Sequence, residues 1–438
     1  MASVAAEPAR VRRASDSAAR AARPHLPIEH SLLLTATLCL LAGGAVMVYS
    51  ASSPAAIDGS TAGGMSALVR FVVYGAVGLV VLRYASRVGL ERVRRLTGPL
   101  LGLSFALLIA VRLPGLGHST LGAERWIGAG PLQFEPSELM KLALVLYAAH
   151  VLARGRPGTR SRTTAFKRVA VVGGAACLLV GSQPDIGTTL VIAFALAAIV
   201  LTAGISMRAF VLVAILCAGA VIVFSIAVPY AGARLTSFLD PWAHATQSGY
   251  QSVQSQVAIG SGGLFGRGPG QSLQKDFYLP EAPTDFILAV IGEELGFVGI
   301  AVLLALYGLI AYAGLRAARA AKGSYALLVA AGVTSLIVFQ AALNVFAVLG
   351  IAPVTGVPLP FVSYGASNLL VMLAAMGLLL NVAGGGAAHL RAVRSTEREK
   401  PRRSEDARGT ADSDRSRRDR RARGARAGGR RRAAGAGG

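Results

Sequence analysis

Long apolar stretches constrain the fold of this chain more than any other feature of its sequence. A helix needs roughly 20 apolar residues to cross a bilayer core of about 30 Å. Only 15% of the residues are charged, against about 25% in soluble domains. We therefore predict an all-α polytopic membrane protein with about ten transmembrane helices. The predicted spans lie near 31–50, 66–84, 96–113, 136–153, 168–182, 186–205, 208–229, 285–314, 325–349 and 365–383.

The basic residues of the connections predict the orientation of these spans. The even-numbered connections, near 83–95, 154–168, 208 and 316–322, carry Lys and Arg, whereas the odd-numbered ones are poor in both. Because cytoplasmic loops are enriched in Lys and Arg, both termini are expected in the cytoplasm. The longest connection, 230–284, is then a large extracytoplasmic loop before helix 8. Its turn glycines and aromatic residues favour an ordered, functional loop.

The two ends of the chain differ in composition from the region between them. From Arg391 onward the chain has 17 Lys and Arg against 7 Asp and Glu, and the N-terminus is also rich in Arg. Such segments bury too little apolar surface to fold. We expect disordered, basic, cytoplasmic segments at 1–30 and 384–438, flanking a transmembrane domain at 31–383. Beside a membrane, anionic lipids are a more natural partner for them than nucleic acid.

Cysteine and histidine give no sign of a metal centre. Cys39, Cys177 and Cys217 each lie within an apolar stretch, and the six histidines are scattered. Neither a structural zinc site nor a disulfide framework is expected.

The first candidate cluster lies between Gly122 and Lys141, on the predicted outer side. It contains Arg125 and Trp126, followed by a predicted helix start at Pro136. Glu138 and Lys141 are three residues apart, so they share a helix face and can pair. This pair has two interpretations: a structural ion pair, or part of a polar cleft in which Arg125 and Lys141 meet an anionic ligand.

Two further clusters contain a carboxylate at a predicted membrane boundary. Asp185, in SQPDIGTT, is either the cap of a tight outer hairpin or a carboxylate that faces a ligand. Asp285, in YLPEAPTDFILAVIGEELG, opens span eight, with Glu293 and Glu294 about two turns deeper. Thr284 or Asp285 could cap this helix, whereas a carboxylate at the interface would also suit a general base.

The glycine-rich stretch from Gly249 to Lys275 precedes the third cluster. It lacks GxxxxGK[ST] and no strand precedes it, so a phosphate-binding P-loop is excluded. Turns between interfacial helices explain the glycines better. Arg267 and Lys275 are cations of this stretch that could face a lipid pyrophosphate, and Gln254 is a further candidate for substrate binding.

These motifs together resemble the SEDS family of bacterial cell-wall proteins, the group of FtsW, RodA and SpoVE. The resemblance covers roughly residues 31–383, and DPW and QSLQKDFYLPEA look closer to FtsW, the division member. The present sequence departs from the family pattern at five positions: Glu124, Glu135, Pro283, Ala366 and Asn368. The matching stretches are GAERWI, FEPSELMK, SQPDIGTTL, LDPW, GYQSVQSQVAIGSGGLFGRG, QSLQKDFYLPEAPTDFI, EELGFVG and TGVPLPFVSYG.

The resemblance implies a peptidoglycan glycosyltransferase that polymerises lipid II at the outer face of the cytoplasmic membrane. Asp285 matches the family's essential aspartate and would be the base of an inverting transfer with undecaprenyl pyrophosphate as leaving group. The negative charge of the pyrophosphate would be stabilised by three cations, Arg125, Lys141 and Lys275. Trp126 would line the cleft, Glu138 would hold Lys141, and Asp185 and Gln254 are expected to bind substrate. No metal site is evident in the sequence, although a divalent cation, Mg²⁺ or Mn²⁺, could assist at the pyrophosphate.

The resemblance also implies partners and a location. A class B penicillin-binding protein would cross-link the new strand, and other divisome proteins would join it at the division septum. Two alternatives stay open: a lipid II flippase, and a non-catalytic scaffold for the transpeptidase. A flippase predicts charged residues along a route through the bilayer, whereas the ionisable residues here gather mostly on the predicted outer side.

Overall fold

The computed structural model describes the membrane domain and not the two basic ends. The chain divides into two units, Met1–Gly385 and Gly386–Gly438, and every described residue belongs to the first. The predicted disordered ends therefore lie almost wholly outside the described residues. The structure describes residues 27–56, 63–113, 117–120, 123–128, 133–155, 160–204, 237–276 and 278–385, with Val211, Gly219 and Gly232 as isolated positions.

Nine of the ten predicted spans correspond to helices among these residues. The seventh, 208–229, lies outside them except for two isolated positions. Several helices begin earlier than predicted. The largest differences are in α4, which begins at Leu90, and α6, which begins at Arg160, because polar residues continue these two helices beyond the apolar stretch. The helices are α2 (Ile28–Ser52), a 3₁₀ turn η1 (Ser53–Ala56), α3 (Gly64–Ala85), α4 (Leu90–Ala110), α5 (Pro136–Arg154), α6 (Arg160–Gly181), α7 (Ile186–Thr202), α10 (Tyr250–Gly262), α11 (Ile287–Ala320), α12 (Ser324–Val348) and α13 (Ala366–Ala383).

The length and composition of these helices suit a membrane. Eight of the described helices, α2 to α6 and α11 to α13, are long and apolar enough to span a bilayer, while α7 is equally apolar but has 17 residues. This part of the chain is a multi-pass membrane protein, as the apolar stretches predicted. The prediction of ten spans in total stays a prediction.

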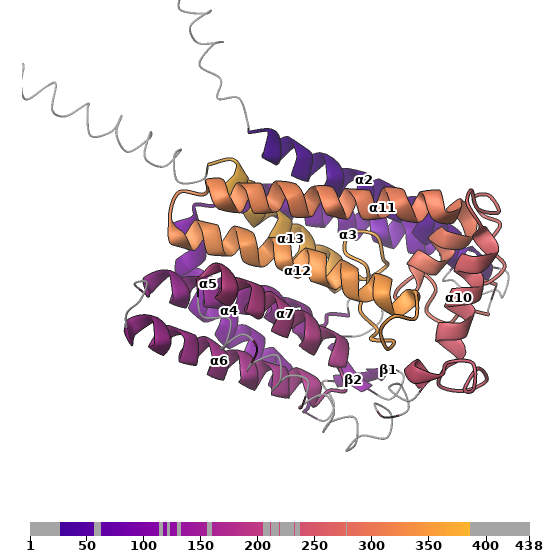
Figure 1. The fold of residues 1–438 in the computed structure, drawn as a ribbon, viewed down its shortest axis with the longest axis horizontal. Coiled ribbons are helices and arrows are strands. Elements are labelled where there is room, and N and C mark those ends of the chain that lie inside the picture. Colours follow the sequence, from indigo (N-terminus) through magenta and orange to yellow (C-terminus); the bar gives the residue numbers. More distant parts are fainter. Residues whose placement is uncertain are drawn as a thin grey trace, which may run out of the picture. The chain divides into compact units, whose positions relative to one another are not determined.

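Helices α5, α12 and α13 are the most buried of the set. Helix α12 packs against α5, α7, α11 and α13, and α13 packs along α3 (Figure 1). A helix surrounded by others is apolar on all sides rather than on one stripe, as α12 is. Small residues permit these close approaches: a Cβ on Gly377 of α13 would lie 2.5 Å from the Leu82 carbonyl oxygen of α3.

Helix α11 is two helices joined at a kink. Gly296 has a φ of 67°, a left-handed conformation that glycine adopts without strain. The kink frees backbone groups that must be satisfied at membrane depth. A turn after α10 supplies their partners: Phe297 N–H donates to the Gly263 carbonyl at 2.9 Å, and Arg267 N–H donates to the Glu293 carbonyl at 2.9 Å.

Two small elements lie between the membrane helices. Strands β1 (Gly117–Thr120) and β2 (Ala123–Ile127) form an antiparallel hairpin between α4 and α5, which the sequence analysis did not predict. Helix α10, in the long predicted outer loop, packs against α11 and α12. Figure 1 shows the hairpin and α10 at the same end of the helices, where α11 begins. The candidate residues gather at this end.

Candidate active site

The first turn of α5 carries a buried ion pair. The helix begins at Pro136, as predicted, because proline suits the first helical position. Glu138 and Lys141 then lie on one face, and Lys141 Nζ donates to Glu138 Oε1 at 2.8 Å. Both side chains are almost completely buried. The predicted pairing is confirmed. Replacing either residue alone would leave the charge of the other buried and unpaired, which would destabilise the fold.

The pair continues into a chain of amides. Lys141 Nζ also donates to Gln340 Oε1 of α12 at 2.7 Å. Gln340 Nε2 in turn donates to Asn368 Oδ1 of α13 at 2.8 Å and to the Pro358 carbonyl at 2.9 Å. Among the described residues, Glu138 Oε2 and Asn368 Nδ2 are buried without a hydrogen-bond partner. This series of hydrogen bonds therefore has an unused acceptor at Glu138 and an unused donor at Asn368.

The sequence analysis missed the contribution of α12 to this cluster. Gln340 and Asn344 are four residues apart, so they share a face of an otherwise apolar helix. Polar side chains inside a membrane span are costly and commonly functional. This spacing of two amides was the signal that would have pointed to α12.

Arg125 and Asp185 are brought together from different elements. Asp185 caps α7, since Thr188 N–H donates to its Oδ1 at 3.1 Å, so the predicted capping role is confirmed. Arg125 of β2 donates from Nε to the Gln183 carbonyl at 2.9 Å and from Nη2 to the Pro184 carbonyl. Its Nη1 lies 4.0 Å from Asp185 Oδ1. Arg125 therefore fixes the turn before α7.

Glu135 adds a third carboxyl group next to these charges. It occupies the N-cap position of α5, and Ser137 Oγ donates to its Oε1 at 2.8 Å. Burial, and next the charges of Asp185 and Glu138, together raise the pKa of Glu135 to about 8. Glu135 is thus mostly protonated at neutral pH, which relieves the repulsion among the three acids.

Asp285 lies where the long loop enters α11. The helix begins at Ile287, two residues later than predicted, and its N-cap position is Phe286. Asp285 is half-buried. A Cβ on Gly356, which has a φ of 69°, would lie 3.4 Å from Asp285 Oδ2. The carboxylate therefore lies against the segment between α12 and α13.

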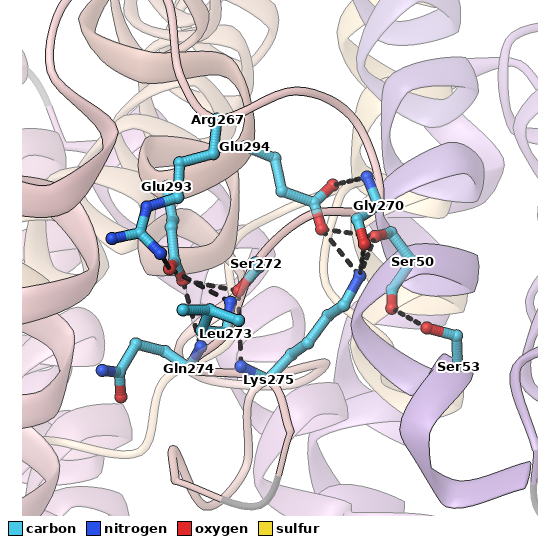
Figure 2. A network of polar contacts seen from close by, with 10 residues as sticks. All are labelled: Ser50, Ser53, Arg267, Gly270, Ser272, Leu273, Gln274, Lys275, Glu293 and Glu294. Carbon is cyan, nitrogen blue, oxygen red and sulfur yellow. Dashed lines mark hydrogen bonds and ion pairs between the residues drawn. The ribbon is translucent and has the colours of Figure 1, made fainter. Parts of the chain in front are cut away.

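Lys275 belongs to a separate buried cluster, shown in Figure 2. Its Nζ donates to Glu294 Oε1 at 2.9 Å, to Ser50 Oγ at 3.0 Å and to the Gly270 carbonyl at 2.8 Å. An ammonium group has three donors, so all of them are used. This cluster ties the loop before Asp285 to α2 and α11. A role of Lys275 at the substrate pyrophosphate stays a prediction.

Glu293 holds the same loop from its other side. Its carboxylate accepts from Ser272 Oγ at 2.6 Å and from the backbone N–H of Leu273 at 3.1 Å (Figure 2). Arg267, which is more exposed, lies 3.6 Å from Glu293 Oε1. Adjacent carboxylates on α11 thus point to different parts of one loop, and both are compensated by donors from it.

Two predicted site residues remain. Trp126 of β2 and Gln254 of α10 are both half-buried, and their roles stay predictions. Within the described residues, no group of three or more His, Cys, Asp and Glu is arranged to hold a metal ion.

The arrangement combines two chemical capabilities. Asp285 is a half-buried residue whose carboxylate is of the kind that can serve as a general base. Arg125 and Lys141 are fixed cations beside Asp185 and Glu138, and preorganised charges of this kind stabilise a charge that develops during a reaction. Such a site suits transfer of a group from an anionic leaving group to a hydroxyl.

Comparisons with known proteins agree with this architecture. The chain is 38% identical over 351 residues to stage V sporulation protein E of Bacillus subtilis, covering 80% of this chain and 96% of that protein. It is 37% identical to a probable peptidoglycan glycosyltransferase FtsW of Coxiella burnetii, covering 80% and 95% of the two chains.

A solved structure shares the fold. It is described as showing structural coordination of polymerization and crosslinking by a peptidoglycan synthase complex. Its matching chain has 32% sequence identity and a TM-score of 0.65, over 80% of this chain and 96% of that chain. The model of the FtsW/RodA/SpoVE family, described as cell cycle protein, matches residues 30–385. From its sequence and its fold alike, the chain belongs to the FtsW/RodA/SpoVE family.

Proposed function

We propose that this protein is a peptidoglycan glycosyltransferase that polymerises lipid II at the outer face of the cytoplasmic membrane, for septal wall synthesis. Its similarity to proteins named probable peptidoglycan glycosyltransferase FtsW supports the activity. The observation that carries the proposal is the half-buried Asp285, at the entry to α11 and against Gly356.

In this proposal Asp285 is the general base. It takes the proton from the 4-hydroxyl of the acceptor N-acetylglucosamine as that oxygen attacks the anomeric carbon of the donor. The bond from this carbon to the pyrophosphate oxygen breaks, and undecaprenyl pyrophosphate leaves with its charge. A positioned base of this kind contributes roughly 10²- to 10⁴-fold to a rate. The lipid tail stays in the bilayer while the sugars reach the site.

Arg125 and Lys141 are the proposed cations for the leaving pyrophosphate. Lys141 is held by Glu138, and Arg125 is held by the backbone carbonyls before Asp185, so they need little reorganisation when charge develops. We also keep a divalent cation, Mg²⁺ or Mn²⁺, at the pyrophosphate as part of the proposal. Loss of polymerisation on adding a chelator, with recovery on adding either metal, would support it.

The proposed partner is a class B penicillin-binding protein. The similarity to a chain of a peptidoglycan synthase complex that coordinates polymerization and crosslinking supports this partner. Further divisome proteins at the septum, and anionic lipids at the basic ends of the chain, complete the proposal. No nucleic-acid partner is proposed.

The test is polymerisation of purified lipid II by the full chain with its transpeptidase partner. We compare the wild type with Asp285→Ala, and with Asp276→Ala as a matched control, because Asp276 is an exposed carboxylate of the same loop. Long glycan is expected from the wild type and from Asp276→Ala, whereas folded Asp285→Ala should form glycan roughly 10²- to 10⁴-fold more slowly.

Any other outcome would contradict part of the proposal. Equal glycan from the Asp285→Ala variant would remove Asp285 from the reaction. The absence of glycan from every variant, with the partner bound, would contradict the polymerase. Movement of labelled lipid II from one leaflet of a vesicle membrane to the other would then identify a flippase. A division defect that depends only on binding of the partner would identify a scaffold.

A further inference from the structure

Asn344 of α12 joins two segments that meet at the proposed base. Its side chain is 2% exposed. Nδ2 donates to the Asp285 backbone carbonyl at 2.7 Å and to the Val357 carbonyl at 2.8 Å. An amide nitrogen has two donors, so both are used. Asp285 is 59 residues away in sequence and Val357 is 13, so these are tertiary contacts.

Both acceptors bear on the position of the Asp285 carboxylate. The first bond holds the backbone from which that carboxylate extends. The second holds Val357, which follows Gly356, the residue against which Asp285 Oδ2 lies. A third link joins the same two segments, since Tyr364 N–H donates to the Pro283 carbonyl at 2.9 Å. Asn344 therefore fixes both the carboxylate's attachment point and the neighbouring wall.

We propose that Asn344 is a positioning residue for the transfer reaction: its amide bridges the Asp285 and Val357 carbonyls and so holds the base in line with the acceptor hydroxyl. The proposal rests on the proposed function of Asp285. Asn344 acts through the backbone and needs no contact with substrate. Its loss should lower kcat and leave KM nearly unchanged, since a displacement of about 1 Å can cost about 10²-fold in rate.

The chain contains a matched control for this amide. Asn381 of α13 is also buried, and its Nδ2 donates to two backbone carbonyls, those of Ala85 at 3.1 Å and Val88 at 2.6 Å. In both residues Oδ1 is buried without a hydrogen-bond partner among the described residues. The Asn381 bridge joins α13 to the end of α3 instead of the start of α11. Replacing either residue removes the same chemistry.

The experiment measures lipid II polymerisation by the full chain with its transpeptidase partner. Asn344→Leu keeps a similar volume and removes both donors. We expect a 10- to 100-fold lower kcat with KM within about threefold. Asn381→Leu should lower the melting temperature about as much as Asn344→Leu does, but it should keep kcat within about threefold of the wild type. Asn344→Ser, with one donor, should be intermediate, and it serves as the test if the leucine variant does not fold.

A double-mutant comparison separates positioning from a general loss of structure. In an Asp285→Ala background, Asn344→Leu should not lower the residual activity further, because the two residues act as one unit. An independent loss there would overturn the proposal, as would an unchanged kcat in Asn344→Leu or an equal kcat loss in Asn381→Leu. If Asp285→Ala is as active as the wild type, it is instead the proposed function that fails.

Discussion

Replacing Lys275 by methionine tests whether the cluster in Figure 2 is structural. The substitution keeps most of the apolar stem and removes the ammonium. Glu294, which is 1% exposed, would keep Ser50 Oγ and the Gly270 N–H as donors but lose its counter-charge. Breaking one side of a buried ion pair costs about 3–5 kcal/mol. We expect a loss of unfolding free energy of that size for Lys275→Met.

An exposed ion pair provides the control. Arg316 Nε lies 3.1 Å from Glu29 Oε1, and the Arg316 side chain is 56% exposed. Exposed pairs of this kind contribute little to stability, so Arg316→Met should leave the unfolding free energy nearly unchanged. The unfolding free energies are measured by equilibrium unfolding in mixed detergent micelles. If Lys275→Met costs no more than Arg316→Met, the structural reasoning is refuted.

A paired substitution separates the structural role of Lys275 from a role at the substrate. Lys275→Met with Glu294→Gln removes both charges together and should restore most of the lost stability. If Lys275 acts only by ordering the loop before Asp285, polymerisation of lipid II recovers with stability. If Lys275 binds the pyrophosphate, the paired variant is stable but remains inactive.

Three further predictions follow from single positions. Folding raises the pKa of Glu135 to about 8, so the folded state binds the proton of this carboxyl more tightly than the unfolded state. The protonated carboxyl therefore contributes to stability at low pH, and this contribution falls as pH rises from about 4.5 to 8. Glu135→Gln should remove that fall, as melting temperatures between pH 5 and 9 would reveal. Gly187→Ala would place a Cβ 2.6 Å from the Thr355 carbonyl oxygen and should lower polymerisation, whereas Gly174→Ala, with open space, should not. Gly262→Ala would overlap the backbone of α11 and should reduce the yield of folded protein, as size-exclusion chromatography would detect.

Local features of the sequence predicted part of the site. Glu138 and Lys141 were paired correctly because a separation of three residues on a helix sets their proximity. The capping of α7 by Asp185 was likewise predictable, since a cap involves residues close in sequence. Both interactions are local, so spacing alone was sufficient.

Other parts of the site depended on contacts that spacing does not reveal. Lys275 was expected to face a ligand, yet its donors are taken by Ser50, Glu294 and Gly270. Ser50 is 225 residues away in sequence. The bridge from Asn344 to Asp285 spans 59 residues. Nothing in one chain's spacing indicates which distant carbonyl or hydroxyl a buried donor will meet.

The sequence by itself determined that this protein is a multi-pass membrane protein, because a bilayer requires long apolar helices and nine of the ten predicted spans appear as described helices. Its motifs also determined the family. Only the tertiary structure decided the partners of charged groups that lie far apart in the sequence, such as those of Lys275. Those partners come from separate helices and loops, and their positions depend on how the helices pack rather than on where each residue falls along the chain.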